Sequence, residues 1–210
     1  NTISGKLYVG YSSGSNGYYL LSDAGTLTIN PGGEIRVGAD NGTGRFDWLS
    51  SSTSLRTPAL TLGSRGTLAM GFDFDVASLL NGTLFNNGSP GTLTGLSSAS
   101  LDIMGNATAT HASGTTLAVR NLTVGHWTSG TYVQNGGTNT ISGTLYVGHN
   151  EGNDIGGTGQ YILDGGQLSA PSEYIGYKNG KGTFTQTSGV NNVAGTLALG
   201  ANSYSPGEAT

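Results

Sequence analysis

Asp73 and Asp75, in the stretch FDFD, form the closest pair of carboxylates in this chain of 210 residues. Residues two apart in a strand lie on one face, so both carboxylates would point the same way, as a Ca²⁺ site or a glycosidase acid pair requires. The alternative, which we favour, is a polar outer face with Phe72 and Phe74 turned inward. The stretch DVASLL would then form one short helical turn with Asp75 as its cap.

Two glycine-rich turns carry further acidic residues: GADNGTG holds Asp40, and GHNEGNDIGGTG holds Asp154. Similar turns occur in the Ca²⁺-binding nonapeptide repeats of bacterial secreted proteins, but the spacing GGxGxDxUx that defines those repeats is absent. We therefore predict no cofactor. If an ion is bound, the candidate is Ca²⁺, and its ligands would come from Asp73, Asp75, Asp40 and Asp154.

Two of the three histidines, His126 and His149, each directly follow a glycine that recurs along the chain. If those positions stack on one another, the two imidazoles could bind a metal ion. Tyr, Ala and Ser occupy the same position elsewhere, at Tyr11, Ala39, Ser64, Tyr177 and Ala201. We therefore interpret both histidines as turn residues and predict no metal site; the third is His111.

No catalytic motif is recognisable in the sequence. A GxSxG elbow is absent, no Ser–His–Asp set is identifiable, and the glycine runs fit turns better than nucleotide-binding loops. A polysaccharide lyase or hydrolase, which β-helices can host, would need acidic and basic residues on one face. The sequence offers Asp73, Asp75 and Asp102 with dispersed arginines, so we predict no enzyme and no catalytic residues.

A set of outward aromatic residues is the better candidate for a contact surface. Tyr8, Tyr146 and Tyr174, with Arg36 among them, occupy the variable position of a recurring tetrapeptide. A strip of exposed tyrosines would suit a sugar or a protein. The alternative is that tyrosine is simply favoured in strands.

The elements that would position these residues follow from a repeat. NTISGKLYVG at Asn1–Gly10 returns as NTISGTLYVG at Asn139–Gly148 and as NNVAGTLALG at Asn191–Gly200. Its closing tetrapeptide recurs with steps of 28, 25, 62, 23, 28 and 24 residues between glycines, which are Gly10, Gly38, Gly63, Gly125, Gly148, Gly176 and Gly200. The long step leaves room for two or three further turns, and LDIMG at Gly105 is a candidate for one.

Each copy reads apolar–variable–apolar–glycine, the period-two alternation of a strand with one buried face. A second motif, Gly–x–aromatic, places Tyr19, Phe46, Tyr132, Tyr161 and Phe184 at one position of the repeat. Each unit then holds three short strands separated by turns. We predict an all-β fold, a right-handed parallel β-helix (β-solenoid) with 23–28 residues per coil. A β-sandwich or propeller is the alternative.

The repeat also defines the domain organisation. We predict a single β-solenoid over residues 1–210, with regular coils in 1–63 and 106–210. In 64–105 the register is lost, and we expect an irregular insertion or distorted coils there. Loops of this kind are where recognition concentrates.

The composition excludes several classes of protein. A net charge of −4 and dispersed Lys and Arg argue against nucleic acid as a partner. Cys is absent, so there are neither disulfides nor thiolate metal sites. No apolar run approaches the ~20 residues of a membrane span, so we predict no membrane insertion. The chain starts at Asn1 without Met, and we expect a mature or trimmed form.

The stretch GTGQYILDGGQLSAPSEYIGYKNGKGTFTQTSGVNNVAGTLALG resembles the autotransporter-associated β-strand repeats of very large exported bacterial proteins, often of the PEP-CTERM type. The resemblance covers Asn1–Gly63 and Leu117–Thr210. It implies an extracellular or cell-surface solenoid with structural or adhesive roles, and it carries over no catalytic residues.

We therefore expect a non-enzymatic structural segment of a bacterial surface protein: a stalk, matrix or filament building block. Its partners would be copies of itself or neighbouring repeats of the same long chain. Natural solenoids cap their open ends, and uncapped ends would let coils stack. The alternative is an adhesin that binds polysaccharide, or another surface, through the tyrosine strip and the irregular segment.

Overall fold

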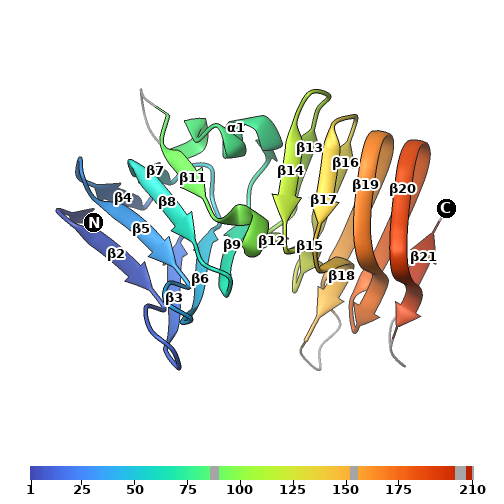
Figure 1. The fold of residues 1–210 in the computed structure, drawn as a ribbon, viewed down its shortest axis with the longest axis horizontal. Coiled ribbons are helices and arrows are strands. Elements are labelled where there is room, and N and C mark those ends of the chain that lie inside the picture. Colours follow the sequence, from blue (N-terminus) through green and yellow to red (C-terminus); the bar gives the residue numbers. More distant parts are fainter. Residues whose placement is uncertain (86–89, 152–155, 202–206, 210) are drawn as a thin grey trace.

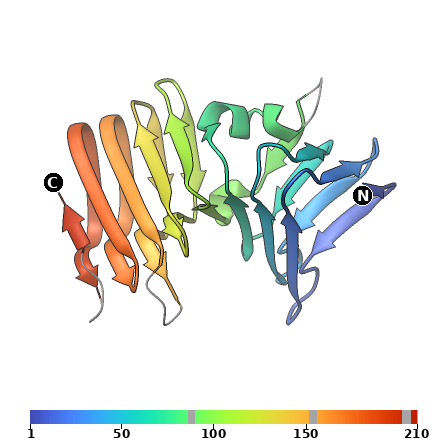
Figure 2. The same ribbon diagram turned by 180° about the vertical axis from the view of Figure 1, so that it is seen from behind.

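The computed structural model describes residues 1–85, 90–151, 156–201 and 207–209. In these residues the chain forms a parallel β-solenoid of about eight coils, which confirms the predicted fold class. The coils stack along the long axis of the molecule, with the N-terminus at one end and the C-terminus at the other (Figure 1; Figure 2 shows the same stack from behind).

The first three coils each contain three strands. They are β1 (Thr2–Ile3), β2 (Lys6–Val9) and β3 (Asn16–Leu21), then β4 (Thr26–Ile29), β5 (Glu34–Val37) and β6 (Thr43–Trp48), then β7 (Ser54–Arg56), β8 (Ala59–Leu62) and β9 (Gly66–Met70). Strands at the same place in successive coils pair in parallel, β1 with β4 and β7, and β2 with β5 and β8. Each face of the solenoid is therefore a parallel sheet made of equivalent strands.

The middle of the chain departs from this pattern on one side only. After β9 come β10 (Phe74–Asp75), helix α1 (Val76–Leu80), the 3-10 turn η1 (Thr83–Phe85), β11 (Thr92–Thr94) and the 3-10 turn η2 (Leu96–Ser98). Helix α1 lies at one edge between the two sets of regular coils (Figure 1). As predicted, Asp75 is its N-cap, since the Asp75 carboxylate accepts from the backbone N–H groups of Ala77 and Ser78 at 2.9 and 3.2 Å.

Regular coils resume with β12 (Ser100–Ile103), followed by β13 (Ala107–His111), β14 (Thr116–Val119) and β15 (Asn121–His126), then β16 (Gly130–Gln134), β17 (Thr138–Ile141) and β18 (Thr144–Asn150). The last two complete coils are single long strands, β19 (Thr158–Lys178) and β20 (Lys181–Ala201), and β21 (Gly207–Ala209) pairs with β20. As LDIMG suggested, β12 lies in register with β15, so that Leu101 faces Leu122.

One face, which we call the continuous face, runs through the whole solenoid. It consists of β3, β6, β9, β12, β15, β18 and the last parts of β19 and β20. Its inward ladder is unbroken in register, through Tyr19, Phe46, Leu68, Leu101, Leu122, Leu145, Glu173 and Leu197. This ladder joins the two halves despite the irregular side.

The ladder corrects one inference from the sequence, because the motif shifts by one strand between the halves. Leu60 belongs to the sheet of β2, β5, β8 and β11, whereas Leu122, 62 residues later, lies on the continuous face. Likewise Tyr19 stacks on Phe46, while Tyr132 stacks on Tyr161 in a different ladder. The recurring aromatic strands therefore do not share one position of the solenoid.

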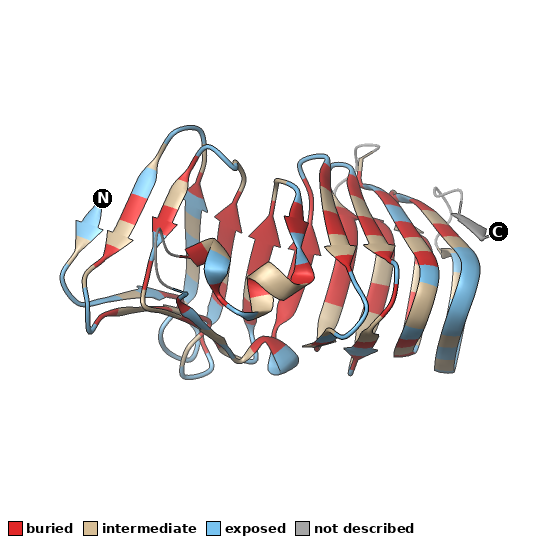
Figure 3. Cartoon of the chain, turned by 90° about the horizontal axis from the view of Figure 1, so that it is seen from above, coloured by how far each residue is buried: buried red, intermediate tan, exposed pale blue. Residues whose placement is uncertain are grey.

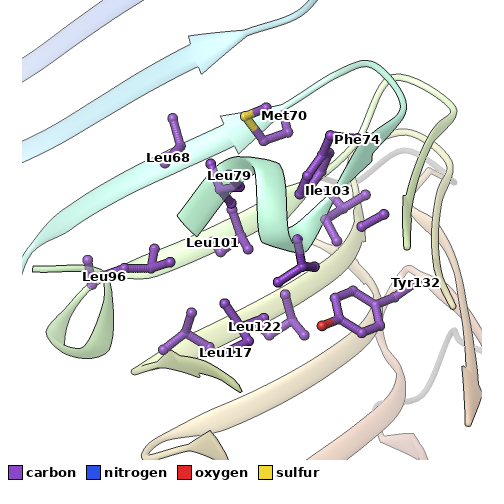
Figure 4. Packing of buried hydrophobic residues seen from close by; sticks show 14 of the residues in the cluster. Leu68, Met70, Phe74, Leu79, Leu96, Leu101, Ile103, Leu117, Leu122 and Tyr132 are labelled. Carbon is purple, nitrogen blue, oxygen red and sulfur yellow. The ribbon is translucent and has the colours of Figure 1, made fainter. Parts of the chain in front are cut away.

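Apolar inward residues form one core along the axis, and exposed residues gather in the turns and on β20 (Figure 3). Around the irregular coil, Leu79 of α1 packs among Leu68, Leu101 and Ile103 (Figure 4). The helix thus closes the core where a regular strand is missing, and the interior stays continuous.

Candidate functional site

The acidic residues that the sequence suggested for Ca²⁺ lie apart. Asp75 caps α1, and Asp73 accepts the backbone N–H of Thr108 at 2.7 Å. Asp40 is exposed in a turn, and Asp154 lies outside the described residues. Phe74 is buried, as in the favoured alternative. Among the residues that the structure describes, no group of three His, Asp or Glu side chains could hold a metal ion.

The predicted tyrosine strip is divided between two sheets. Tyr8 and Arg36 face each other on β2 and β5, whereas Tyr146 and Tyr174 face each other on β18 and β19 of the continuous face. Arg36 forms an ion pair with Glu34, whose Oε1 lies 2.6 Å from the Arg36 Nε. The four residues occupy the same position of the sequence motif, but the motif shifts by one strand between the two halves. The predicted single contact surface is therefore wrong.

A network of buried charges lies on the outer side of the continuous face. Arg45 of β6 pairs with Asp47, Nε to Oδ1 at 2.7 Å, and with Asp102 of β12, Nη1 to Oδ2 at 2.6 Å. His126 of β15 brings its Nδ1 to 2.7 Å from the same Asp102 oxygen. Tyr18 of β3 donates its hydroxyl to Asp47 at 3.0 Å.

The register explains how Arg45 reaches so far. Asp47, Ala69 and Asp102 follow one another in the outward row of β6, β9 and β12. Ala69 ends at Cβ, so the arginine side chain can pass over β9 to the carboxylate on β12. The network therefore connects coils on both sides of the irregular segment.

Burial and charge act against each other in this network. Desolvation alone would raise the pKa of Asp102, but the bonds and charges of His126 and Arg45 outweigh it and lower the pKa to about 2. For Asp47 desolvation is the larger effect, and its pKa is raised despite Arg45. Asp102 is thus the ionised carboxylate that both Arg45 and His126 contact.

A carboxylate bonded to the Nδ1 of a histidine is also the arrangement that orients a general base. Here the other ring nitrogen, Nε2 of His126, is buried and has no hydrogen-bond partner among the described residues. Asp102 shares its oxygen between His126 and Arg45. In this arrangement a substrate cannot reach the imidazole, and the network fits a structural role better than acid–base catalysis.

His126 and His149 lie in β15 and β18 and pair with each other, so our interpretation of them as turn residues was wrong. Their rings stack, as equivalent positions in neighbouring coils suggested. Their ring centroids are 5.1 Å apart and the rings are tilted by 8°. A metal ion must lie in the plane of each imidazole it binds, and two nearly parallel planes at this separation cannot share one. Burial and the charge of His126 lower the pKa of His149 to about 4, so His149 is neutral near pH 7.

Beside His149 lies a cluster that we call the Tyr platform: Tyr146, Tyr174 and Tyr177. The Tyr146 ring lies 5.6 Å from Tyr174 and 5.1 Å from Tyr177, and Tyr174 lies 5.0 Å from Tyr177. His149 stacks on Tyr146 at 4.7 Å. All three tyrosines are half-buried, so parts of their rings meet solvent.

Two charges border the Tyr platform. The Lys178 ammonium lies 5.6 Å from the centre of the Tyr177 ring and 3.5 Å from Oε1 of Glu151. Sequence reasoning did not include Tyr177, Lys178 and Glu151 among the contact residues. A signal was present, because Tyr177 follows a repeat glycine just as His126 and His149 do.

His111, the third histidine, is buried in the core. Its Nε2 lies 3.0 Å from the carbonyl oxygen of Thr115, and its Nδ1 lies 2.9 Å from the hydroxyl of Tyr132. Desolvation lowers its pKa, partly offset by the bond to Thr115. A neutral ring that donates from Nε2 and accepts from Tyr132 at Nδ1 satisfies both nitrogens, which is a structural arrangement.

The irregular segment borders a cavity of about 490 Å³. Its wall is made by aromatic, aliphatic, hydroxyl and acidic side chains: Trp48, Ser51, Ser52, Thr53, Ser54, Leu55, Phe72, Asp73, Thr83 and Leu84. Trp48, the largest ring in the wall, is 3% exposed, and its Nε1 donates to Thr53. It therefore offers a ligand little stacking surface, and the Tyr platform is the better candidate site.

No described helix is long and apolar enough to span a membrane. No protein-family model matches this chain, and neither does any curated protein or solved structure.

Proposed function

We propose that this chain is a non-enzymatic structural segment of a bacterial extracellular or cell-surface protein. Its solenoid would serve as a stalk, a matrix component or a filament building block that lengthens by stacking coils. The resemblance to autotransporter-associated repeats supports the location, and the continuous core supports the mechanical role. The observation that supports the proposal most directly is the exposure of inward leucines on β20, the last complete coil.

That coil leaves inward residues uncovered. Along the ladder of Ile103, Val124, Val147, Ile175 and Leu199, the first four residues are fully buried, but Leu199 is 50% exposed. Leu197, the last residue of the neighbouring ladder, is 54% exposed. Burying a fully exposed leucine side chain contributes about 1.5–3 kcal/mol, and roughly half of this remains to be gained for each of these two leucines. A further coil in the same register would therefore be stabilised on β20.

The first coil offers a compatible surface. Its inward residues include Leu7 and Tyr19, which are partly exposed and pack against the core. In head-to-tail stacking of two copies, Tyr19 on the continuous face of one copy would meet Leu197 of the other. The molecule already contains such a pair, since Phe46 lies opposite Leu68 in the same face.

Negative-stain electron microscopy over a concentration series tests this stacking. We expect rods of uniform width that lengthen with concentration, and only short rods for the double variant Leu197→Asp, Leu199→Asp. Val190→Asp is the matched control, because Val190 is 56% exposed on the same strand but faces Gln167 in an outward row. Short rods of wild-type protein at every concentration would refute stacking between copies.

A further inference from the structure

The Tyr platform ends abruptly at the last coil. Tyr146, Tyr174 and Ala198 follow one another in one outward row of β18, β19 and β20, and His149, Tyr177 and Ala201 do so in the next. In the first row the two tyrosine rings stack, and in the second row the His149 and Tyr177 rings are in contact but tilted by 56°. On β20 both positions hold alanine.

The orientation of the tyrosine rings shows which ring face is left without an aromatic partner at β20. Tyr146 and Tyr174 belong to adjacent coils, and their rings are tilted by only 17° at 5.6 Å. Rings stacked in this way turn their faces along the solenoid axis, so the second face of Tyr174 is directed toward β20. There the residue opposite is Ala198, which ends at Cβ.

The aromatic ladder inside the core makes the contrast clear. Tyr132 stacks on Tyr161 at 4.9 Å, and Tyr161 stacks on Phe184 at 5.2 Å. There the last coil supplies a ring to cover the one below it. On the outer face it supplies a methyl group, which leaves a ledge above Ala198 beside a flat aromatic surface.

The chemistry of the ledge suits a sugar ring. A pyranose has a C–H face that packs flat against an aromatic ring, and its rim carries hydroxyl groups. The ledge provides the flat surface of Tyr174, with the tilted Tyr177 ring 5.0 Å away. The Lys178 ammonium, 5.6 Å from the centre of the Tyr177 ring, and the Glu151 carboxylate, 3.5 Å from that ammonium, border the same platform and can donate to and accept from hydroxyls.

We propose that Tyr174 and Tyr177 bind a pyranose ring of a neutral polysaccharide, which rests above Ala198 in the place of the missing aromatic ring. The ligand is neutral because Lys178 is paired with Glu151, so the site carries no net charge. A net charge of −4 for the whole chain argues against polyanions. This site goes beyond the structural role, because a solenoid can lengthen without binding any glycan.

Affinity electrophoresis in native gels that contain xylan, hydroxyethyl cellulose, galactomannan or dextran tests the proposal. We expect wild-type protein to be retarded by at least one of these neutral polysaccharides. Tyr174→Ala with Tyr177→Ala should weaken binding by about tenfold or more, because the two substitutions remove the flat surface on which the sugar ring rests. Tyr8→Ala with Tyr11→Ala is the matched control, because that pair of tyrosines is exposed on another face.

A second variant removes no aromatic residue. Ala198→Leu fills the ledge and should abolish retardation, whereas Asn192→Leu, which adds the same side chain at an exposed position elsewhere on β20, should not. Far-UV circular dichroism confirms that each variant is folded. Three results overturn the proposal: no retardation of wild-type protein by any of the four, retention of binding in Ala198→Leu, or equal loss in the Tyr8 and Tyr11 control. Rod length in the microscope is a separate readout, so stacking and glycan binding can fail independently.

Discussion

Arg45 of β6 and Asp102 of β12 are 57 residues apart in sequence, yet the Arg45 Nη1 lies 2.6 Å from the Asp102 Oδ2. The pair spans β9 and joins a coil that precedes the irregular segment to one that follows it. Both side chains are largely buried. A buried pair of this kind makes each partner depend strongly on the other.

Asp102→Asn should destabilise the fold markedly. The substitution keeps the shape of the side chain but leaves Arg45 buried with Asp47 as its remaining anion. Removing one partner of a buried ion pair costs about 3–5 kcal/mol. Urea unfolding at pH 7 measures this loss. The control is Glu34→Gln, whose partners Lys6 and Arg36 are much more exposed and which should cost less than about 1 kcal/mol; similar losses for the two variants would contradict the prediction.

Stability should fall on acidification because of His149. Its pKa is about 4 in the folded protein, against 6.5 for an unperturbed histidine such as that of the unfolded chain. Between these values the unfolded state binds more protons, so the free energy of unfolding decreases as the pH falls from 6.5 to 4. The shift corresponds to at most about 3 kcal/mol.

Urea unfolding at intervals from pH 7 to pH 4 measures this dependence, with His149→Gln as the comparison. The variant has no imidazole to protonate, so its stability should change less over the range. If the two proteins lose stability in parallel, His149 is not the group responsible. Asp102 interferes little, because its effect on stability falls mostly between its ordinary pKa of 3.8 and its folded pKa of about 2, and both proteins carry it.

Glu173 should act in the opposite direction. It takes the place of a leucine in the inward ladder of the continuous face, between Leu145 and Leu197, and is fully buried. Burial raises its pKa, partly offset by the bond from Asn191 Nδ2 to Oε2 at 3.0 Å. The folded state therefore holds its proton longer than the unfolded state, and stability falls as the pH rises through the pKa of the folded protein.

Glu173→Gln removes that cost and keeps an oxygen for Asn191. We expect the variant to be more stable than wild type at pH 7, with a gain that shrinks toward pH 4. Denaturant midpoints at the two pH values measure it. Asp164→Asn, at an exposed carboxylate of the same strand, should leave the midpoint nearly unchanged. A variant less stable than wild type at pH 7 would show that Glu173 stabilises the fold in its ionised form.

The alternation of the repeat was sufficient to predict the parallel solenoid and most of its core. Leu122, Val124, Leu145 and Val147 are all buried where the pattern placed them inward. Such positions repeat because each must pack against the coil on either side. The cap at Asp75 was also predictable, since capping depends on local sequence alone.

The motif shift was not predictable, because it depends on how many residues the irregular segment uses to pass around the axis. Local patterns do not encode that count, and tyrosines at equal positions in the motif were therefore assigned to one face. The network of Arg45, Asp102 and His126 was missed for the same reason. Its members become neighbours only when β6, β12 and β15 are placed in register.

Gly148 shows how closely the coils approach, and it gives the sharpest prediction for the repeat glycines. Its φ is +73°, and a Cβ atom at this position would overlap the carbonyl oxygen of Lys181 in a neighbouring coil. Gly14 has a similar φ of +81°, but a Cβ there meets nothing within 4 Å. Gly14→Ala should therefore cost only the backbone strain, about 1 kcal/mol, whereas Gly148→Ala must also displace a coil and should cost at least about 3 kcal/mol. Thermal and urea unfolding of the two variants compare these costs directly, and equal losses would mean that the backbone conformation alone, rather than the close approach of coils, requires glycine after each LYVG strand.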